Sequence, residues 1–265
     1  MILLVDIGGT YTKISIAENL KRIKNFTIYP TKYKYNEFIE FIKTFNNKEI
    51  KVACFGIAGM LDKEKSKVIY SPSLKDFINK KLKTDLEKIL KTKIILENDA
   101  ILGAIGESYY GRGKNFYSFG YITLGTGIGG AKIVNKNIDN NNFGFEPGHS
   151  IVFIEKIKKF FEIEKLIGGK NIKEKYGLIS KKLKNKNFSN FYYNILSALI
   201  INTSIFWSVD KIILGGSISK IINYKYLNKI CKNKHPLPIK IKIYSSKLKN
   251  KSTIYGGLIK CQNYM

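Results

Sequence analysis

The chain has 265 residues, which is enough for two modest domains that each bury a core. It carries 46 Lys and Arg against 20 Asp and Glu, and this net charge of +26 favours anionic ligands such as ATP. Nucleic acid is less favoured, because Arg22 and Arg112 are the only arginines and lysine is dispersed through every segment. We therefore expect a whole-chain compositional bias and no specific nucleic-acid partner.

The sequence also lacks the usual signs of export or membrane insertion. No apolar run is long enough to cross a bilayer, and a strand begins at once without a basic and then apolar leader. Cys54, Cys231 and Cys261 are far apart and form no disulfide framework, which is typical of a reducing compartment. We expect a cytoplasmic protein without a membrane partner.

In chain order, the first element is a strand, a glycine turn with a threonine, and a returning strand, and this unit occurs twice. The two units are 3–7, 8–10 and 11–16, and then 121–124, 125–130 and 131–134. Glycines in such turns let backbone N–H groups approach a phosphate without hindrance from a Cβ atom. A lone turn of this kind is usually just a tight hairpin turn, but the pair suggests a nucleotide gripped between two domains.

The rest of the chain alternates apolar strand-like runs with helical spacing, which predicts an α/β fold with a partly parallel sheet. Strands are predicted at 52–58, 94–96, 209–214 and 240–244, and helices at 37–45, 79–90, 100–110, 155–167, 190–206 and 253–261. The Asn-rich segment 135–142 is expected to form a turn. The repeated hairpin indicates two similar halves.

Polar residues and glycines follow several of these strands, where open α/β sheets bind ligands. Gly59 follows strand 52–58, Asn98 and Asp99 follow strand 94–96, and a glycine pair follows strand 209–214. Asp6 ends the first strand beside its glycine turn, a position suited to holding magnesium through water.

Two polar groups have both a chemical and a structural interpretation. In an Asn-Asp pair, the amide can bind a sugar hydroxyl group while the carboxylate accepts a proton from another. Either residue can equally be a helix N-cap. Glu146 and His149 flank a Pro-Gly turn and suit hydroxyl recognition, although a lone histidine is more often structural.

Five motifs in order resemble those of the ROK family, which comprises sugar kinases and related repressors of the actin-like ATPase superfamily. They are Asp6-Ile-Gly-Gly-Thr10, Glu97-Asn-Asp-Ala100, Leu124-Gly-Thr-Gly-Ile-Gly-Gly130, Glu146-Pro-Gly-His149 and Leu214-Gly-Gly216. The resemblance implies two actin-like (ribonuclease H-like) α/β domains with a cleft between them. The expected domains are 1–106, with helix 253–265 packing back on it, and 107–252.

The resemblance also implies roles for matching positions. Asp99 is expected to be the general base, and Asp6 the magnesium anchor. The expected sugar-binding residues are Gly59, Asn98, Glu146, His149 and Glu164. The expected ATP-binding residues are Asp6, Gly8, Gly9, Thr10, Lys13, Gly125, Thr126, Gly127, Gly215 and Gly216.

The chain departs from the family pattern in two places. Most ROK proteins follow the Glu-x-Gly-His turn with a cysteine cluster that binds zinc together with the histidine, but 150–164 contains no cysteine. We therefore expect no structural zinc, and we expect apolar residues to pack helix 155–167 instead. Ser73 stands where many of the family's sugar kinases have Asn, which puts the exact sugar in question.

The resemblance implies an ATP- and Mg²⁺-dependent kinase that phosphorylates a hexose hydroxyl, with the 6-hydroxyl expected, in a homodimeric protein. An N-acetylmannosamine or N-acetylglucosamine kinase is the alternative enzyme. A sugar-responsive regulator or a non-catalytic sugar- or ATP-binding protein is the alternative of another class. The regulators carry an N-terminal DNA-binding domain, and Met1 directly precedes the first strand here, so we expect the kinase.

Overall fold

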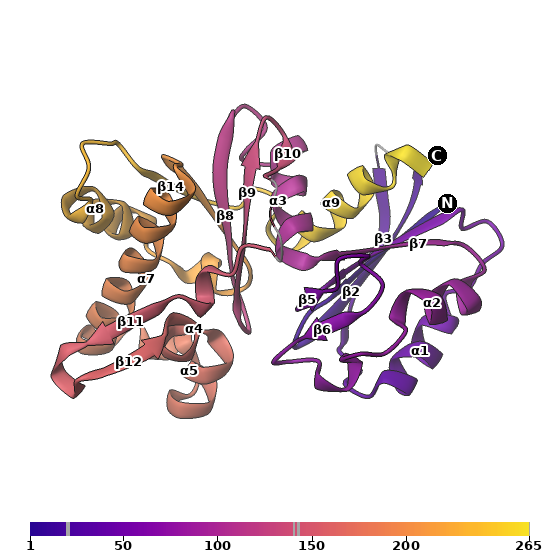
Figure 1. Cartoon of the computed structure of the whole chain (residues 1–265), viewed down its shortest axis with the longest axis horizontal. Coiled ribbons are helices and arrows are strands. Elements are labelled where there is room, and N and C mark those ends of the chain that lie inside the picture. Colours follow the sequence, from indigo (N-terminus) through magenta and orange to yellow (C-terminus); the bar gives the residue numbers. More distant parts are fainter. Residues whose placement is uncertain (20–21, 140, 142–143, 265) are drawn as a thin grey trace. The chain divides into compact units, whose positions relative to one another are not determined.

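The computed structural model describes residues 1–19, 22–139, 141 and 144–264. These residues form two compact units (Figure 1). The first contains 1–106 and the segment from residue 251 to the C-terminus, together with the short stretch around Asn141 and Gly144. The second contains 107–139 and 145–250.

Each unit is built on a five-stranded sheet, and the two sheets have the same strand order. The first sheet has the order β3-β2-β1-β4-β7 and the second β10-β9-β8-β13-β14. In both, the first three strands in sequence form an antiparallel meander, and two later strands add in parallel beside the first. The predicted α/β class with two similar halves is therefore confirmed.

The elements of the first unit agree in kind with most of the sequence-based predictions. The sheet strands are β1 (Ile2–Ile7), β2 (Tyr11–Asn19), β3 (Arg22–Pro30), β4 (Val52–Ile57) and β7 (Lys93–Asn98). A small hairpin comprises β5 (Met60–Leu61) and β6 (Val68–Tyr70), and the helices are α1 (Tyr35–Lys43), α2 (Leu82–Leu90), α3 (Asp99–Tyr109) and α9 (Ser252–Lys260). Helix α3 continues into the second unit after Gly106.

Alternation along the central strands sends side chains to two different cores. On β1, Leu3, Val5 and Ile7 pack with residues of α1 and α2. Ile2 and Leu4 face the other way and pack against α3 and α9. Asp6 has the same parity as Leu4, so the pleat directs its carboxylate to the face covered by α3 and α9.

The second unit repeats the sheet and adds more helices. Its strands are β8 (Ser118–Leu124), β9 (Ile128–Val134), β10 (Asn137–Ile138), β11 (Ile151–Ile154), β12 (Lys159–Glu162), β13 (Lys211–Gly215) and β14 (Lys242–Ser245). Its helices are α4 (Ile163–Ile167), α5 (Gly169–Tyr176), α6 (Ile179–Lys182), α7 (Lys186–Trp207) and α8 (Tyr224–Lys234). Helix α7 supplies a large share of the core residues of this unit.

The predicted helix over 155–167 is wrong. Strands β11 and β12 pair antiparallel, from Ile151 opposite Glu162 to Ile154 opposite Lys159. The connection is a short 3₁₀ turn at Glu155–Ile157, closed by Lys158 in the left-handed conformation with φ 47°. Only Ile163–Ile167 is helical.

The expected packing of this segment is also partly wrong. Phe160 is 72 % exposed and Ile157 is 51 % exposed, whereas Ile163 is buried. The apolar spacing resembled that of a helix because Phe160 and Phe161 of β12 fall three and four positions after Ile157 of the 3₁₀ turn.

The Asn-rich turn is described in part. Asn135 and Lys136 have φ of 47° and 63°, which gives the two-residue hairpin turn between β9 and β10. Asn140 and Asn142, at the end of the expected turn, lie outside the described residues. None of the helices in the described part of the chain has the length and hydrophobicity needed to span a membrane.

Candidate functional site

The candidate residues of the first unit gather at the carboxyl edge of its sheet. Strands β1, β4 and β7 run parallel, and Ile7, Ile57 and Asn98 are neighbours in register across them. Asp6 therefore lies one residue before this edge, while Gly59 and Asp99 lie just beyond it. The expectation that separate segments converge here agrees with the strand register.

Asp6 and Lys13 form a buried ion pair across the first hairpin. The two residues are direct register partners, and Lys13 Nζ lies 2.6 Å from Asp6 Oδ2. Asp6 is only 2 % exposed. Burial lowers the pKa of Lys13, but the charge and hydrogen bond of Asp6, with the charge of Asp99, outweigh it and leave that pKa raised. Lys13 thus stays protonated beside the two acids.

Asp99 is the first residue of α3, and its environment suits proton transfer. Burial raises the pKa of its carboxyl to about 6, and the negative charge of Asp6 adds to the shift, while Lys13 opposes it. A carboxyl group with this pKa is mostly ionised at pH 7 but is more basic than an ordinary aspartate. Such a group can accept a proton from a bound hydroxyl.

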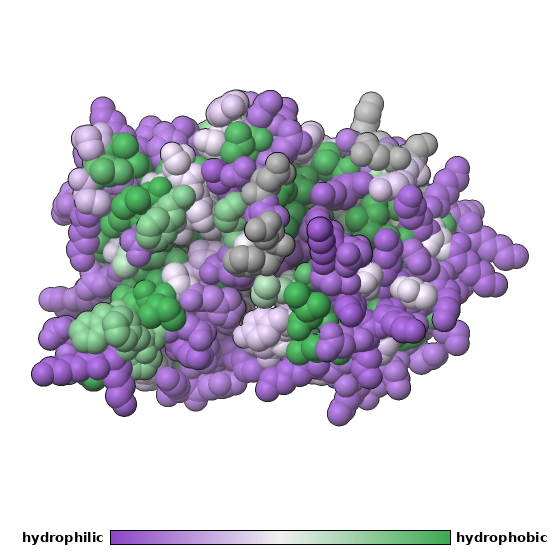
Figure 2. Space-filling view, in the orientation of Figure 1, coloured by the Kyte–Doolittle hydropathy of each residue, from purple (hydrophilic) through white to green (hydrophobic). Residues whose placement is uncertain are grey.

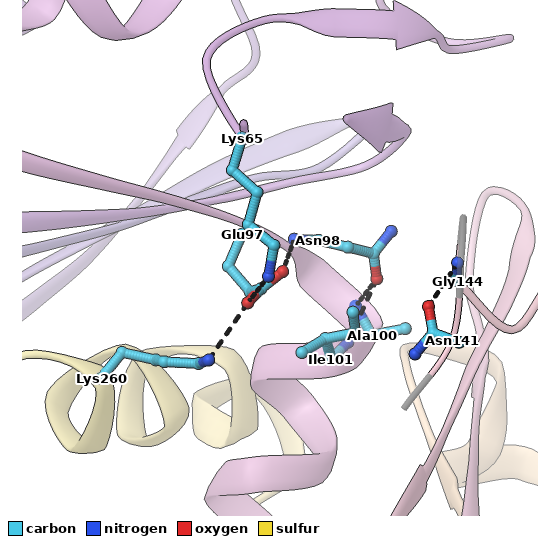
Figure 3. Close-up of polar contacts among 8 residues, drawn as sticks. All are labelled: Lys65, Glu97, Asn98, Ala100, Ile101, Asn141, Gly144 and Lys260. Carbon is cyan, nitrogen blue, oxygen red and sulfur yellow. Dashed lines mark hydrogen bonds and ion pairs between the residues drawn. The ribbon is translucent and has the colours of Figure 1, made fainter. Parts of the chain in front are cut away.

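Asn98 caps helix α3. Its Oδ1 accepts hydrogen bonds from Ala100 N at 2.9 Å and Ile101 N at 3.1 Å, as Figure 3 shows. Its Nδ2 donates to the Gly59 carbonyl at 3.0 Å. The N-cap interpretation therefore describes Asn98, and the same side chain fixes Gly59 beside it.

Gly59 accepts no side chain without rearrangement. A Cβ atom there would lie 2.6 Å from Tyr70 O and 2.9 Å from Ser71 Cβ. Ser71 Oγ donates to Ala58 O at 2.7 Å, so the loop that contains Ser73 begins against the strand end. A glycine is required because the backbone of this loop passes directly over it.

The first glycine turn is held by a segment that the sequence did not single out. Thr31 Oγ1 donates to Gly8 O at 2.7 Å, Tyr33 OH donates to Gly9 O at 2.9 Å, and Thr31 N donates to Thr10 O at 3.1 Å. All three carbonyl groups of the turn thus have partners in 31–33. The turn is therefore fixed by residues more than twenty positions downstream, and no local sequence pattern predicts these contacts.

The second glycine turn, Gly125–Gly127, is held in the second unit by the start of α4 and α5. Gly169 N donates to Gly125 O at 3.0 Å, and Lys170 N donates to Thr126 O at 2.9 Å. Glu164 Oε2 accepts from Ile128 N at 2.6 Å, and a Cβ atom on Gly127 would lie 2.6 Å from that oxygen. Glu164, expected as a sugar ligand, therefore also supports the glycine turn.

Gly215 ends β13, which runs parallel to β8, and Gly216 follows it. A Cβ atom on Gly215 would collide with the Tyr121 hydroxyl group, and Gly216 has φ +82° beside Leu124 O. Ser219 Oγ donates to Gly216 O at 2.8 Å. The pair is thus placed at the carboxyl edge of this sheet, in a tight turn that only glycine adopts easily.

Glu146 and His149 lie on a 3₁₀ turn, Pro147–His149, which packs on β9. Pro147 Cγ would be 2.7 Å from a Cβ atom on Gly130, so Gly130 makes room for the turn. His149 Nδ1 lies 3.4 Å from Glu162 Oε2, and Glu162 also binds Lys165 at 2.9 Å. The hydrogen bonds that Glu162 accepts from Lys165 and from His149 lower its pKa.

Glu162 was missed by sequence reasoning, because the segment was expected to be a helix. A hairpin places Glu162 opposite Ile151, two residues beyond His149. The β-branched residues at 151, 152 and 154 are a strand signal, and a hairpin that pairs them with 159–162 would have indicated the position of Glu162. Among the described residues, no group of three or more His, Cys, Asp or Glu side chains is arranged to hold a metal ion.

A family model described as the ROK family matches residues 2–259. An uncharacterized protein of Clostridium perfringens is 27% identical over 234 residues, covering 83% of this chain and 76% of that protein. A glucokinase of Thermotoga maritima is 29% identical over 157 residues, covering 56% of this chain and 50% of the enzyme. The match thus spans about half the length of this glucokinase.

Solved structures share the fold over nearly the whole chain. A ROK family glucokinase from Streptomyces griseus, in complex with glucose and AMPPNP, has a TM-score of 0.81 at 19% identity, covering 97% of this chain and 98% of that one. A putative N-acetylmannosamine kinase from Listeria monocytogenes has a TM-score of 0.82 at 18% identity, covering 97% of both chains. A ROK family transcriptional regulator, a homologue of the E. coli MLC protein, has a TM-score of 0.79 at 15% identity, covering 97% of this chain and 76% of the regulator. The same fold therefore occurs in kinases and in a regulator.

Proposed function

Because the chain belongs to the ROK family, we propose that it is an ATP-dependent sugar kinase that phosphorylates a hexose, with the 6-hydroxyl as the acceptor. The observation that carries the proposal is Asp99, a carboxyl group with a pKa of about 6 at the carboxyl edge of the sheet, beside Asp6 and Lys13. A carboxyl group whose pKa is raised beside specific charged partners, at the edge where such sheets bind ligands, favours proton transfer over ligand binding alone.

In the proposed reaction, Asp99 accepts the proton of the attacking hydroxyl group as its oxygen bonds to the γ-phosphorus of ATP and ADP leaves. Phosphoryl transfer demands mainly alignment and neutralisation of charge, so one base and two fixed glycine turns are a sufficient protein contribution. Asn98, Gly59, Glu146, His149 and Glu164 are the proposed sugar ligands.

The proposed ATP ligands are the two glycine turns with Lys13, and Gly215 and Gly216 beside the adenosine. The fixed carbonyl groups of Gly8–Thr10 and Gly125–Thr126 hold each turn in one conformation, which suits backbone recognition of phosphates. In the Streptomyces griseus glucokinase, which has this fold, glucose and AMPPNP are bound together, and this supports a hexose and ATP as ligands here.

Magnesium fits the donor set of the first unit. Asp6 and Asp99 repel each other, which is why Asp6 contributes to the raised pKa of Asp99. A dication relieves such repulsion, and Asp6 is the proposed residue that would hold it through water. When bound, magnesium neutralises charge on the phosphates of ATP.

We further propose the two domains 1–106 with 253–265, and 107–252, and a homodimer in the cytoplasm. An N-acetylhexosamine kinase is the second candidate, supported by the shared fold of the Listeria monocytogenes protein. The regulator of the same fold makes sugar-dependent DNA binding the alternative of another class.

A coupled assay of ADP release across a panel of hexoses and N-acetylhexosamines tests the proposal. We expect ADP release that depends on one sugar and exceeds the rate without sugar by at least two orders of magnitude. Equal ADP release with and without every sugar of the panel would contradict a sugar kinase.

A further inference from the structure

A buried carboxylate next to the proposed base is neither the proposed base nor one of the proposed ligands. Glu97, directly before Asn98 and Asp99, is 2 % exposed. Its Oε2 binds Lys65 Nζ at 2.5 Å and Lys260 Nζ at 3.3 Å, and its Oε1 accepts from Asn98 N at 3.2 Å. Figure 3 shows both lysines converging on this carboxylate.

The two lysines come from segments that are distant in sequence. Lys65 belongs to the connection between β5 and β6, and Lys260 is the last residue of α9. Gly59, whose carbonyl group accepts a hydrogen bond from Asn98 Nδ2, directly precedes β5. The end of β7 is therefore tied to the β5–β6 hairpin at two points, Gly59–Asn98 and Lys65–Glu97, and to α9 at a third.

The cluster of Glu97, Lys65 and Lys260 is not well explained as a source of folding stability alone. Removing a carboxylate from water costs free energy that its ion pairs only partly restore, and apolar residues of similar size often stabilise as well or better. The lysine side chains are 47 % and 35 % exposed, so their ammonium groups reach the buried acid from the surface. What the buried carboxylate does provide is a defined position for the end of β7.

We propose that Glu97 is a positioning residue for the transfer reaction: by binding Lys65 and Lys260, it fixes the strand end from which Asn98 and Asp99 project. The inference rests on the proposed kinase function. In this role Glu97 acts through the Asn98 backbone and through the hairpin that Lys65 belongs to, and not by binding a ligand itself. Displacement of a base by a fraction of an ångström lowers turnover without preventing folding.

The kinetic test compares Glu97→Gln and Lys65→Ala with Lys63→Ala. Lys63 is exposed in the same connection, and no ion pair of it is found among the described residues, so its substitution makes the same change of charge without touching Glu97. We expect kcat to fall about ten- to a hundredfold in Glu97→Gln, less in Lys65→Ala, and not in Lys63→Ala, with KM for ATP unchanged. The double variant Lys65→Ala/Glu97→Gln should be no slower than Glu97→Gln.

Amide hydrogen exchange of the same variants, without substrates, separates this inference from the kinase proposal. Glu97→Gln should speed exchange at Ala100 and Ile101, whose N–H groups bind Asn98, relative to the amides of α2. This result supports the positioning role even if the wild-type protein phosphorylates no sugar. Unchanged exchange at those amides overturns it, as does full kcat in Glu97→Gln, or additive losses in the double variant.

Discussion

At the scale of single residues, the central feature is that neighbouring acids differ in environment. Asp6 is held by Lys13 at 2.6 Å, whereas the pKa of Asp99 is raised to about 6 by burial and by Asp6. Two acids with different roles on one sheet edge are a common arrangement in catalysis, because their environments assign one to charge and the other to proton transfer.

The substitution Asp99→Asn tests the assignment of the base. The amide keeps the shape of the side chain but cannot accept a proton, so we expect kcat to fall by about two to four orders of magnitude. Sugar binding, measured by calorimetry, should stay within a few-fold of wild type. A nearly normal kcat in this variant would contradict the assignment of Asp99 as the base and would leave it only a structural role at the start of α3.

The raised pKa of Asp99 predicts a pH dependence of both activity and stability. Turnover should fall as the pH is lowered through about 6, because the base becomes protonated. The folded-state pKa lies above the unfolded value of 3.8, so the folded state holds this proton more tightly, and ionisation of Asp99 costs stability as the pH rises from about 4 to 6.

Asp99→Asn should therefore unfold at a higher temperature than wild type at pH 8, and the difference should vanish below about pH 4. Thermal denaturation at the two pH values measures this directly. A lower unfolding temperature for the variant at pH 8 would be inconsistent with a raised pKa.

At the scale of elements, the glycine hairpins and most helices were predictable, because their signals are local. Gly8–Thr10 and the turn at Gly125 are flanked by apolar strands, and both lie where the sequence predicted. Strand β3 was not predicted, since Asn25 has φ 51° and register shifts near Ile16 and Asn19 interrupt its alternation.

The contacts that fix the candidate site were less predictable than its motifs. Thr31 and Tyr33 hold the first turn, and Glu164 supports the second, from positions more than twenty residues away. Such pairs follow from tertiary packing, and a single sequence gives no periodic signal for them.

Glu164→Ala tests whether the start of α4 supports the glycine turn. Loss of the hydrogen bond from Ile128 N frees the turn, so we expect KM for ATP to rise about tenfold, the lower end of the effect of one hydrogen bond to a charged group. Lys165→Ala, which alters the next side chain on the same helix, is the control. A rise confined to KM for the sugar would limit Glu164 to its expected role as a sugar ligand.

At the scale of the whole molecule, charge is the most conspicuous property. Hydrophilic side chains are spread over the face of both units drawn in Figure 2, and green areas include the region of the β11–β12 hairpin. In this hairpin Ile151, Phe153 and Phe160 are exposed apolar residues. The net charge of +26 attracts polyanions without selecting a sequence.

DNA should therefore bind weakly, without sequence preference, and should dissociate at moderate salt. Gel-shift titration with random and selected DNA fragments, with and without hexose, measures this. One fragment bound far more tightly than the others at physiological salt, with an affinity altered by sugar, would favour a regulator instead.

The measurement that tests the central claim most directly is phosphorus NMR of a reaction containing the protein, ATP, Mg²⁺ and the preferred hexose. We predict a new phosphomonoester signal split by two protons, as a phosphate on a CH₂ oxygen requires, growing in proportion to ADP and absent with Asp99→Asn. ADP accompanied only by inorganic phosphate, or a phosphomonoester formed equally well by Asp99→Asn, would contradict the account.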